Sequence, residues 1–367
     1  MSNNYVAIMA GGIGSRFWPS SRAHRPKQFL DILGVGKSLI QLTYDRFAKV
    51  VPEENIFIVT NEQYKQLVKE HLPKVTDNQI LCEPSRNNTA PCVAYTAFKL
   101  RSLDPNANFV VAPSDALVLK EDVFVEALRK ALDFTQSYGA IVTLGISPSR
   151  PDTGYGYINF DEEVVAEAPI TEGIGPVHRV IEFKEKPDAT TAQQYLDSGR
   201  YLWNAGIFVS KASTMLMAFE THASEIYQIL RAGDGRYNTK EEQSFIDEAY
   251  PATPAISVDY AIMEKADNVY TIPVEFGWSD LGTWGSLHQE KTKDSHQNTG
   301  TAVKVLTLDT TNTLVHAPQE KLVIIKGLDD YIVVDEQDVL LIFPKNQEQE
   351  IKALTKRIEE LEGKRYL

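Results

Sequence analysis

The first half of this 367-residue chain alternates short β-rich runs with segments whose apolar residues recur at helical spacing. The β-rich runs are residues 5–10, 55–59, 79–81, 108–111 and 140–145. The helical patterns between them are residues 39–50, 62–70, 89–100 and 122–137. This alternation predicts right-handed βαβ units on a Rossmann-like, mixed but mostly parallel sheet flanked by helices. Ligands of such α/β sheets bind beyond the carboxyl ends of the strands.

The second half has a different texture. Residues 154–160 and 177–183 are expected to form strands of a β insertion, and residues 207–210 and 269–273 further strands of the main sheet. A polar linker at 294–299 precedes short strand patterns at 301–308, 313–315, 321–326, 331–334 and 339–343. We therefore predict a main domain at 1–293 and a small β appendage with a terminal helix at 294–367. No convincing internal sequence repeat is found there.

The terminal helix pattern has one apolar stripe, formed by Ile351, Leu354, Ile358 and Leu361. Such a stripe either caps the chain's own appendage or contacts another copy of the chain. We favour the intramolecular cap.

Composition narrows the class of protein. The formal net charge of -13 argues against general nucleic-acid binding, which needs a basic face. The first residues show no secretory pattern, and their apolar run is far too short to cross a bilayer. Cys82 and Cys92 lack zinc or redox spacing, and the seven histidines form no H-E-x-x-H motif. These features predict a cytoplasmic enzyme with buried, reduced cysteines, without membrane or nucleic-acid partners.

The strand pattern at 5–10 leads into Gly11, Gly12 and Gly14, followed by Arg16 and later Lys27. Glycines let backbone N–H groups approach an anion closely. No acidic residue precedes Asp31 in this acidic chain. This local reversal of charge predicts a polyphosphate ligand; the alternative is a tight turn without a ligand.

Two common phosphate loops are excluded. The dinucleotide fingerprint G-x-G-x-x-G fails because residue 17 is Phe17. The P-loop pattern ending at Gly36-Lys37-Ser38 fails because it needs a glycine where Asp31 stands. Arg22 and Arg25, which lie near the glycines, are expected to be solvated or to add only to the local field.

The string Ala10-Gly-Gly-Ile-Gly-Ser-Arg-Phe-Trp-Pro19, followed by Pro26-Lys27-Gln28-Phe29, resembles the signature of sugar-1-phosphate nucleotidyltransferases, and within them the mannose-1-phosphate guanylyltransferases. Further motifs match in the same order: Glu83-Pro84 with Asn88-Thr89-Ala90-Pro91, Ala112-Pro113-Ser114-Asp115, Glu185-Lys186-Pro187, Asn204-Ala205-Gly206, Ser257-Val258-Asp259-Tyr260 and Gly277-Trp278-Ser279-Asp280. The resemblance implies a nucleotidyltransferase (GT-A-like) fold with a β-helix-like appendage.

The resemblance also implies an activity. GMP would pass from GTP to α-D-mannose 1-phosphate, giving GDP-mannose and pyrophosphate, with Mg²⁺ as cofactor and a possible homodimer as the assembly. The chain has no His-rich motif after residue 316 that would indicate the isomerase domain of some relatives, so one activity is expected. Two alternatives stay open: a nucleotidyltransferase for another sugar 1-phosphate or base, and a non-catalytic regulatory homologue that binds nucleotide-sugar.

The expected chemistry is an in-line attack of a sugar-phosphate oxygen on the α-phosphorus, which requires positioning and charge neutralisation. Asp115 and Asp280 match the metal-binding aspartates, although Asp280 alone would pass for a structural turn residue. Arg16 offers a bidentate fork to the triphosphate, and Lys27 a point charge.

The remaining nucleotide contacts are assigned to residues around the glycines and after the third strand: Ala10, Gly11, Gly12, Gly14, Glu83, Arg86, Asn88 and Thr89. Relatives commonly have Arg directly before Asn-Thr-Ala, whereas here Asn87 stands there and Arg86 precedes it. Either Arg86 still reaches the nucleotide, as we expect, or the charge is lost and Asn87 binds the nucleotide through its amide alone.

The sugar-phosphate contacts are assigned to Gly154, Glu185, Lys186, Asn204 and Asp259. Lys186 would reach the phosphate, and Glu185 and Asn204 the hexose hydroxyls. Each has a structural alternative: an exposed ion pair for Glu185 and Lys186, a turn for Asn204, a hairpin glycine for Gly154 and a helix cap for Asp259.

Overall fold

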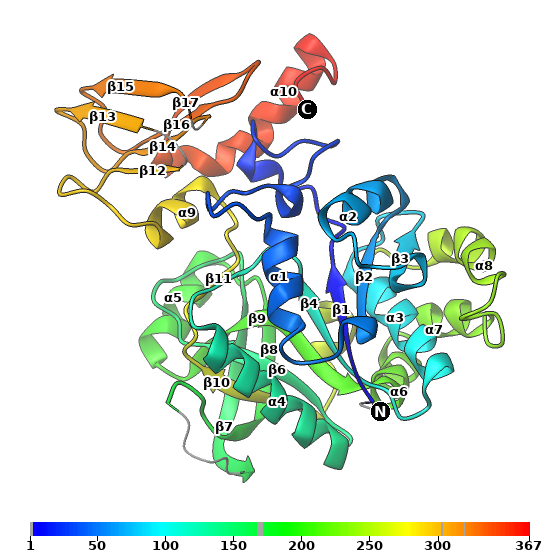
Figure 1. Cartoon of the computed structure of the whole chain (residues 1–367). Helices are drawn as coiled ribbons and strands as arrows, with labels where there is room; N and C mark the ends of the chain where they lie inside the picture. The colour runs from blue at the N-terminus through cyan, green and yellow to red at the C-terminus, as the bar shows by residue number, and fades with distance from the viewer. Residues whose placement is uncertain (1–2, 167–171, 302–303, 319) are drawn as a thin grey trace. The chain divides into compact units, whose positions relative to one another are not determined.

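The computed structural model describes residues 3–166, 172–301, 304–318 and 320–367 (Figure 1). The chain divides into two compact units, which are described separately. The first unit comprises Met1–Gly11, Thr43–Ser114 and Val118–Trp278. The second comprises Gly12–Leu42, Asp115–Leu117 and Ser279–Leu367.

A nine-stranded sheet forms the centre of the first unit, in the order β3-β2-β1-β4-β9-β6-β10-β8-β7. All of its strands except β8 and β9 run in the same direction, so the sheet is mixed but mostly parallel, as predicted. Its strands are β1 Asn4–Met9, β2 Ile56–Asn61, β3 Ile80–Glu83, β4 Asn108–Pro113, β6 Ile141–Ile146, β7 Gly156–Ala166, β8 Val177–Glu185, β9 Tyr201–Lys211 and β10 Val269–Val274.

Helices cover both faces of this sheet. On β4, Phe109 and Val111 belong to the same buried cluster as residues of α3. Their neighbour Asn108 points the other way and donates from Nδ2 to the carbonyl of Leu132 in α4 at 3.0 Å. This alternation along the strand places α3 and α4 on opposite faces.

The helices of the whole chain are α1 Leu39–Phe47, α2 Lys65–His71, α3 Thr89–Leu103, α4 Glu121–Ser137, α5 Ala189–Ser198, α6 Ala212–His222, α7 Ser224–Arg231, α8 Glu242–Ala249, α9 Trp284–Glu290 and α10 Ile351–Glu362. The short strands β5 Leu117–Val118 and β11 Trp278–Ser279 lie outside the large sheet. Among the described residues, no helix combines the length and the apolar character that crossing a membrane would require.

The expected β insertion is wrong in one respect. β7 and β8 are strands of the main sheet itself, because β8 pairs antiparallel with β10 and β7 pairs antiparallel with both β8 and β9. The sequence pattern identified the strands but not their partners, since pairing is decided by residues distant in the chain.

The second unit contains a β-helix-like appendage, here defined as residues 299–367. Its strands are β12 Thr299–Thr301, β13 Lys304–Leu308, β14 Leu314–His316, β15 Leu322–Lys326, β16 Tyr331–Asp335 and β17 Leu340–Pro344. β13 pairs parallel with β15, and β14 with β16. The expected strand at 301–308 includes residues 302 and 303, which lie outside the described residues.

The appendage has a structural repeat that sequence analysis did not find. Leu306 pairs with Ile324, and Val315 with Val333, so both parallel pairs advance by the same number of residues. A side-chain ladder follows the same spacing, with Asn312 Nδ2 donating to Asp330 Oδ1 at 2.8 Å. The repeat lies in the course of the backbone. The residue types at equivalent positions vary too much for the sequence to reveal it.

The terminal helix caps its own unit. Ile351 is buried in a cluster with appendage residues, and Leu354 and Ile358 pack against that cluster. Leu361 is 73% exposed and does not share this role. The domain boundary placed at residue 294 stays a prediction, because the packing units follow spatial contacts and each is built from several segments of the chain.

Candidate active site

The glycine-rich loop, here residues 12–29, folds back on itself. Gly14 has φ +73°, and a Cβ there would lie 2.5 Å from the Cβ of Lys27. The Lys27 backbone N–H donates to the carbonyl of Ile13 at 3.2 Å, and Gln28 Nε2 donates to the carbonyl of Gly12 at 3.0 Å. Gly14 is therefore required by both conformation and space. Gly12 is exposed, with open space where a Cβ would be.

The Lys27 ammonium is buried among oxygens of three residues. Its Nζ lies 2.8 Å from Asp115 Oδ2, 3.0 Å from the carbonyl oxygen of Asp280 and 2.9 Å from that of Leu281. An ammonium has three donors, so these acceptors use its full capacity. The structure thus brings together three of the four predicted catalytic residues, although they are far apart in sequence.

Asp115 lies just beyond the end of β4, and its side chain is 31% exposed. Asp280 follows β11 in a turn, where its Oδ1 accepts from the Gly282 N–H at 2.9 Å. No cluster of three or more His, Cys, Asp or Glu side chains suited to a metal is present in the part of the chain that the structure describes. Of the two aspartates, Asp115 contacts Lys27 through its carboxylate and Asp280 through its backbone carbonyl.

Arg16, the fourth predicted catalytic residue, is half-buried in the 3₁₀ helix Ser15–Phe17. Its charge acts on Glu348, whose pKa is raised by burial and lowered in part by hydrogen bonds and by Arg16. Within the described ranges the Arg16 guanidinium makes no hydrogen bond or ion pair. Its donors are therefore available to an anion.

The end of β3 places a buried carboxylate beside the chain after β1. Glu83 accepts a short hydrogen bond from the Tyr250 hydroxyl, and its Oε2 lies 3.4 Å from the position of a Cβ on Gly11. Burial raises the pKa of Glu83 to about 7, against the opposing hydrogen bonds from Tyr250 and Cys92. Sequence reasoning missed Tyr250, because nothing local distinguishes it from a core tyrosine.

Ala10 is already engaged with β2. Its N–H donates to the carbonyl of Val59 at 2.7 Å, and its carbonyl accepts from the Thr60 hydroxyl at 2.9 Å. These contacts fix the position of the chain at the end of β1, directly before Gly11 and Gly12.

The segment before α3 holds Arg86 and Asn88 at its surface. Arg86 donates to the Tyr64 hydroxyl at 2.7 Å. Asn88 has φ 69°, an uncommon conformation for a residue other than glycine, and accepts from the Thr89 N–H at 2.9 Å. Thr89 in turn accepts on Oγ1 from the Val258 N–H at 2.9 Å.

Asn87, which stands where relatives have Arg, is buried and structural. Its Nδ2 donates to the carbonyls of Tyr250 at 3.1 Å and Thr253 at 2.8 Å. The sequence alternative in which Asn87 binds nucleotide through its amide therefore conflicts with these contacts.

Four of the five predicted sugar-phosphate residues gather in the first unit. Asn204 on β9 donates from Nδ2 to Asp259 Oδ1 at 3.1 Å, and Glu185 at the end of β8 pairs with the adjacent Lys186. Lys186 has φ 46°, a left-handed conformation that is uncommon for lysine. Asp259 begins a π-helical turn, Asp259–Met263, of a kind often found at functional sites.

Two carboxyl groups, those of Asp259 and Glu185, dominate the electrostatics of this cluster. Burial, and next the charge of Glu185, raise the pKa of Asp259 to about 7. The Lys186 ammonium is more than half exposed, with its side chain at 56%. Thr143 on β6, which sequence reasoning did not single out, orients Asn204 by donating to its Oδ1 at 2.8 Å.

Gly154 differs from these four residues. Its N–H donates to Asp152 Oδ1 at 2.8 Å, while Asp152 Oδ2 pairs with Arg150 at 2.7 Å. The amide predicted to meet the sugar is thus held by a carboxylate of its own loop.

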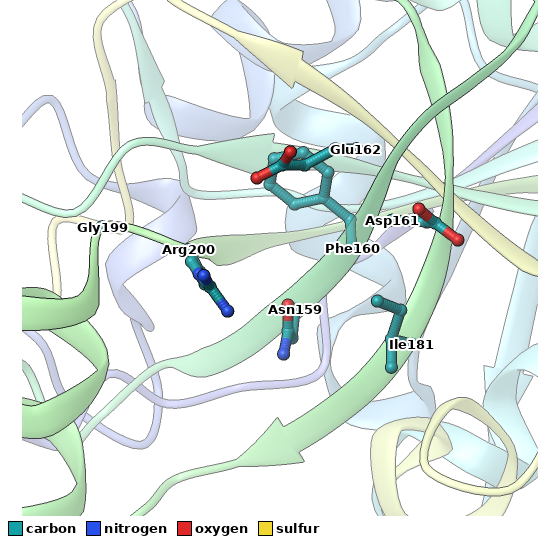
Figure 2. Close-up of a pocket in the computed structure, with 7 residues that line it drawn as sticks. All are labelled: Asn159, Phe160, Asp161, Glu162, Ile181, Gly199 and Arg200. Carbon is teal, nitrogen blue, oxygen red and sulfur yellow. The ribbon is translucent and has the colours of Figure 1, made fainter.

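A separate hollow of about 410 Å³ lies over β7 and β8 (Figure 2). Its lining residues are Asn159, Phe160, Asp161, Glu162, Ile181, Gly199 and Arg200. None of these is a predicted site residue, so the hollow is distinct from the clusters described above.

The fold combines a mixed α/β sheet with a β-helix-like appendage, and a lysine of its glycine-rich loop lies between two aspartates. Together these features define a nucleotidyltransferase. The comparison with known families agrees. Residues 5–297 match the Nucleotidyl transferase family, and residues 303–358 match the MannoseP isomerase/GMP-like beta-helix domain. The chain belongs to the nucleotidyl transferase family.

Its relatives are similar over nearly the whole chain. The mannose-1-phosphate guanylyltransferase of Salmonella montevideo is 36% identical over 96% of this chain and 73% of its own length. That of Escherichia coli K12 is 35% identical over 97% of this chain and 74% of its own length. A crystal structure from Thermus thermophilus, titled mannose-1-phosphate geranyltransferase, has a TM-score of 0.85 at 30% identity, covering 98% of this chain and 100% of that one.

Proposed function

We propose that this enzyme transfers GMP from GTP to α-D-mannose 1-phosphate, giving GDP-mannose and pyrophosphate. The observation that carries this proposal is the convergence of Lys27, which belongs to the glycine-rich loop, with Asp115 and Asp280. The names of its relatives support guanine and mannose as the base and the sugar.

Asp115 and Asp280 fit Mg²⁺ by the hard oxygens of their carboxylates, and both residues contact Lys27, Asp115 through Oδ2 and Asp280 through its backbone carbonyl. Mg²⁺ commonly takes one or two carboxylates and completes its shell with phosphate oxygens and water, so a pair of aspartates suffices. When bound, the ion would neutralise charge on the phosphates during the displacement.

The protein groups contribute positioning and charge. The guanidinium of Arg16 binds phosphate oxygens, and the backbone of Gly12 and Gly14 allows close approach of the triphosphate. Lys27 neutralises Asp115 and supplies positive charge beside the reacting phosphates.

The nucleoside contacts are assigned to the end of β3 and the start of α3, where Glu83 offers a carboxylate acceptor beside Gly11. Arg86, Asn88 and Thr89 complete that set.

The sugar-phosphate contacts are assigned to the cluster of Glu185, Lys186, Asn204 and Asp259. Its carboxylates can accept from hexose hydroxyls, its amide can both donate to and accept from them, and the exposed Lys186 side chain can meet the phosphate. We place the reaction in the cytoplasm, in keeping with the free cysteines Cys82 and Cys92. A homodimer is the assembly we propose.

The test is a pyrophosphate-release assay with four nucleoside triphosphates and several sugar 1-phosphates. We expect kcat/KM for GTP with mannose 1-phosphate to exceed every other pair by about 100-fold, or about 2.7 kcal/mol. Asp115→Asn serves as the inactive control, and chelation of Mg²⁺ should abolish release. Preference for another base or sugar would replace this assignment, and release in no combination would favour a regulatory role.

A further inference from the structure

The glycine-rich loop is anchored by aromatic residues immediately after Arg16. Phe17 and Trp18 are buried, and the Phe17 ring lies 4.8 Å from that of Trp284, centroid to centroid. Trp284 Nε1 donates to the Trp18 carbonyl at 3.2 Å. Trp18 Nε1 donates at 2.7 Å to the carbonyl of Tyr366, the penultimate residue of this sequence.

Polar contacts continue the same attachment. Arg22 was expected to be solvated or to add only to the local field, but it forms a bidentate pair with Asp338: two of its guanidinium nitrogens lie 2.7 Å and 2.5 Å from the carboxylate oxygens. The Arg22 side chain is only 11% exposed. Ser20 donates to Glu336, so both partners lie in the turn between β16 and β17. A bidentate guanidinium–carboxylate pair fixes orientation as well as distance.

A shared apolar core completes the attachment. Residues of the loop and of the segment that follows it are buried in one cluster with residues of the appendage. The cluster includes Phe17, Trp18, Leu30 and Ile32 from the first set, and Leu314, Ile332, Val334, Leu341 and Ile351 from the second. The appendage therefore contacts the segment adjoining the predicted triphosphate ligands, rather than lying apart as a separate module.

These contacts divide the loop into two parts. Gly12, Gly14 and Arg16 form the part predicted to meet the triphosphate, and residues 17–22 form the part fixed to the appendage. We propose that the C-terminal appendage positions the glycine-rich loop for nucleotide binding, with the Arg22–Asp338 pair as a positioning contact. This inference rests on the proposed function only for the identity of the nucleotide.

The test compares Arg22→Gln, Asp338→Asn and the charge swap Arg22→Asp with Asp338→Arg. We expect each single variant to raise the KM for GTP about fivefold and to leave the KM for mannose 1-phosphate unchanged within about twofold. Hydrogen–deuterium exchange of the amides of residues 12–22 should be faster in both single variants. The charge swap should recover part of both effects.

Lys321→Gln is the matched control, because it removes a Lys–Asp pair within the appendage, Lys321 with Asp335, for which the described residues show no hydrogen bond or ion pair to the loop. It should change neither the KM for GTP nor exchange in residues 12–22. If Arg22→Gln lowers the melting temperature while exchange and the KM for GTP stay at wild-type values, the pair is merely structural and the inference is wrong. The exchange measurement decides this even if GTP proves not to be the substrate.

Discussion

Lys27 shows how one buried side chain links three parts of the sequence. Its ammonium forms an ion pair with Asp115 and hydrogen bonds with the backbone carbonyls of Asp280 and Leu281. A Cβ on Gly14 would collide with the Cβ of Lys27. Burying an ammonium is costly unless acceptors surround it, so this arrangement requires every one of those partners.

Lys27→Ala and Lys186→Ala should therefore affect different steps. We expect Lys27→Ala to lower kcat on the order of 100-fold, because it removes positive charge beside Asp115, one of the two aspartates proposed to hold Mg²⁺. Lys186→Ala should mainly raise the KM for mannose 1-phosphate, because Lys186 belongs to the cluster of Glu185, Lys186, Asn204 and Asp259 that we propose binds the sugar phosphate. Steady-state kinetics with each substrate varied in turn separates the two effects, and the reverse pattern would mean that the roles are exchanged.

Glu83 makes stability depend on pH. Its folded-state pKa of about 7 lies above the ordinary glutamate value, so the folded protein holds this proton more tightly than the unfolded chain. The stabilisation is complete below the ordinary pKa and is lost as pH rises through about 7.

Glu83→Gln should remove that dependence. Relative to the variant, the wild type should lose about 2 to 3 kcal/mol of unfolding free energy between pH 5 and pH 8. Urea denaturation at both pH values measures the difference, with Glu248→Gln on the exposed face of α8 as control. Parallel curves for wild type and Glu83→Gln would show that the carboxyl titrates normally.

Among the secondary-structure elements, α10 provides a test of packing with an internal control. Ile351 is fully buried in the appendage cluster, whereas Leu361 on the same helix is 73% exposed. Ile351→Ala removes buried methyl groups and leaves a cavity, so it should cost about 2 to 4 kcal/mol of unfolding free energy. Leu361→Ala should cost less than about 0.5 kcal/mol by the same urea titration. Equal effects would mean that α10 does not cap the appendage as the structure has it.

The elements also show where local pattern was sufficient. The runs predicted at 89–100 and 122–137 correspond to α3 and α4, because apolar-rich runs of this length are too long for typical strands. The strands β7 and β8 were found by pattern but assigned to an insertion, since backbone hydrogen bonding to β9 and β10 leaves no local mark.

For the molecule as a whole, local sequence pattern was enough to predict the class of fold, and it indicated candidate residues for the site. Glycines, charged residues and strand periodicity are local properties, so they indicated the glycine-rich loop and Asp115 as candidates, whereas Asp280, Glu185, Lys186, Asn204 and Asp259 became candidates through the family resemblance. Their motif order also indicated the family, which the comparisons confirm.

Only the tertiary structure shows which residues those candidates contact. Folding sets Lys27 against Asp115, Arg22 against Asp338, and Asn87 into the core beside Tyr250. It also joins residues 12–42 and the C-terminal appendage into one packing unit, although the two segments lie at opposite ends of the sequence. The physical reason is that burial, charge pairing and register depend on groups brought together by folding, and no local pattern encodes which distant groups those are.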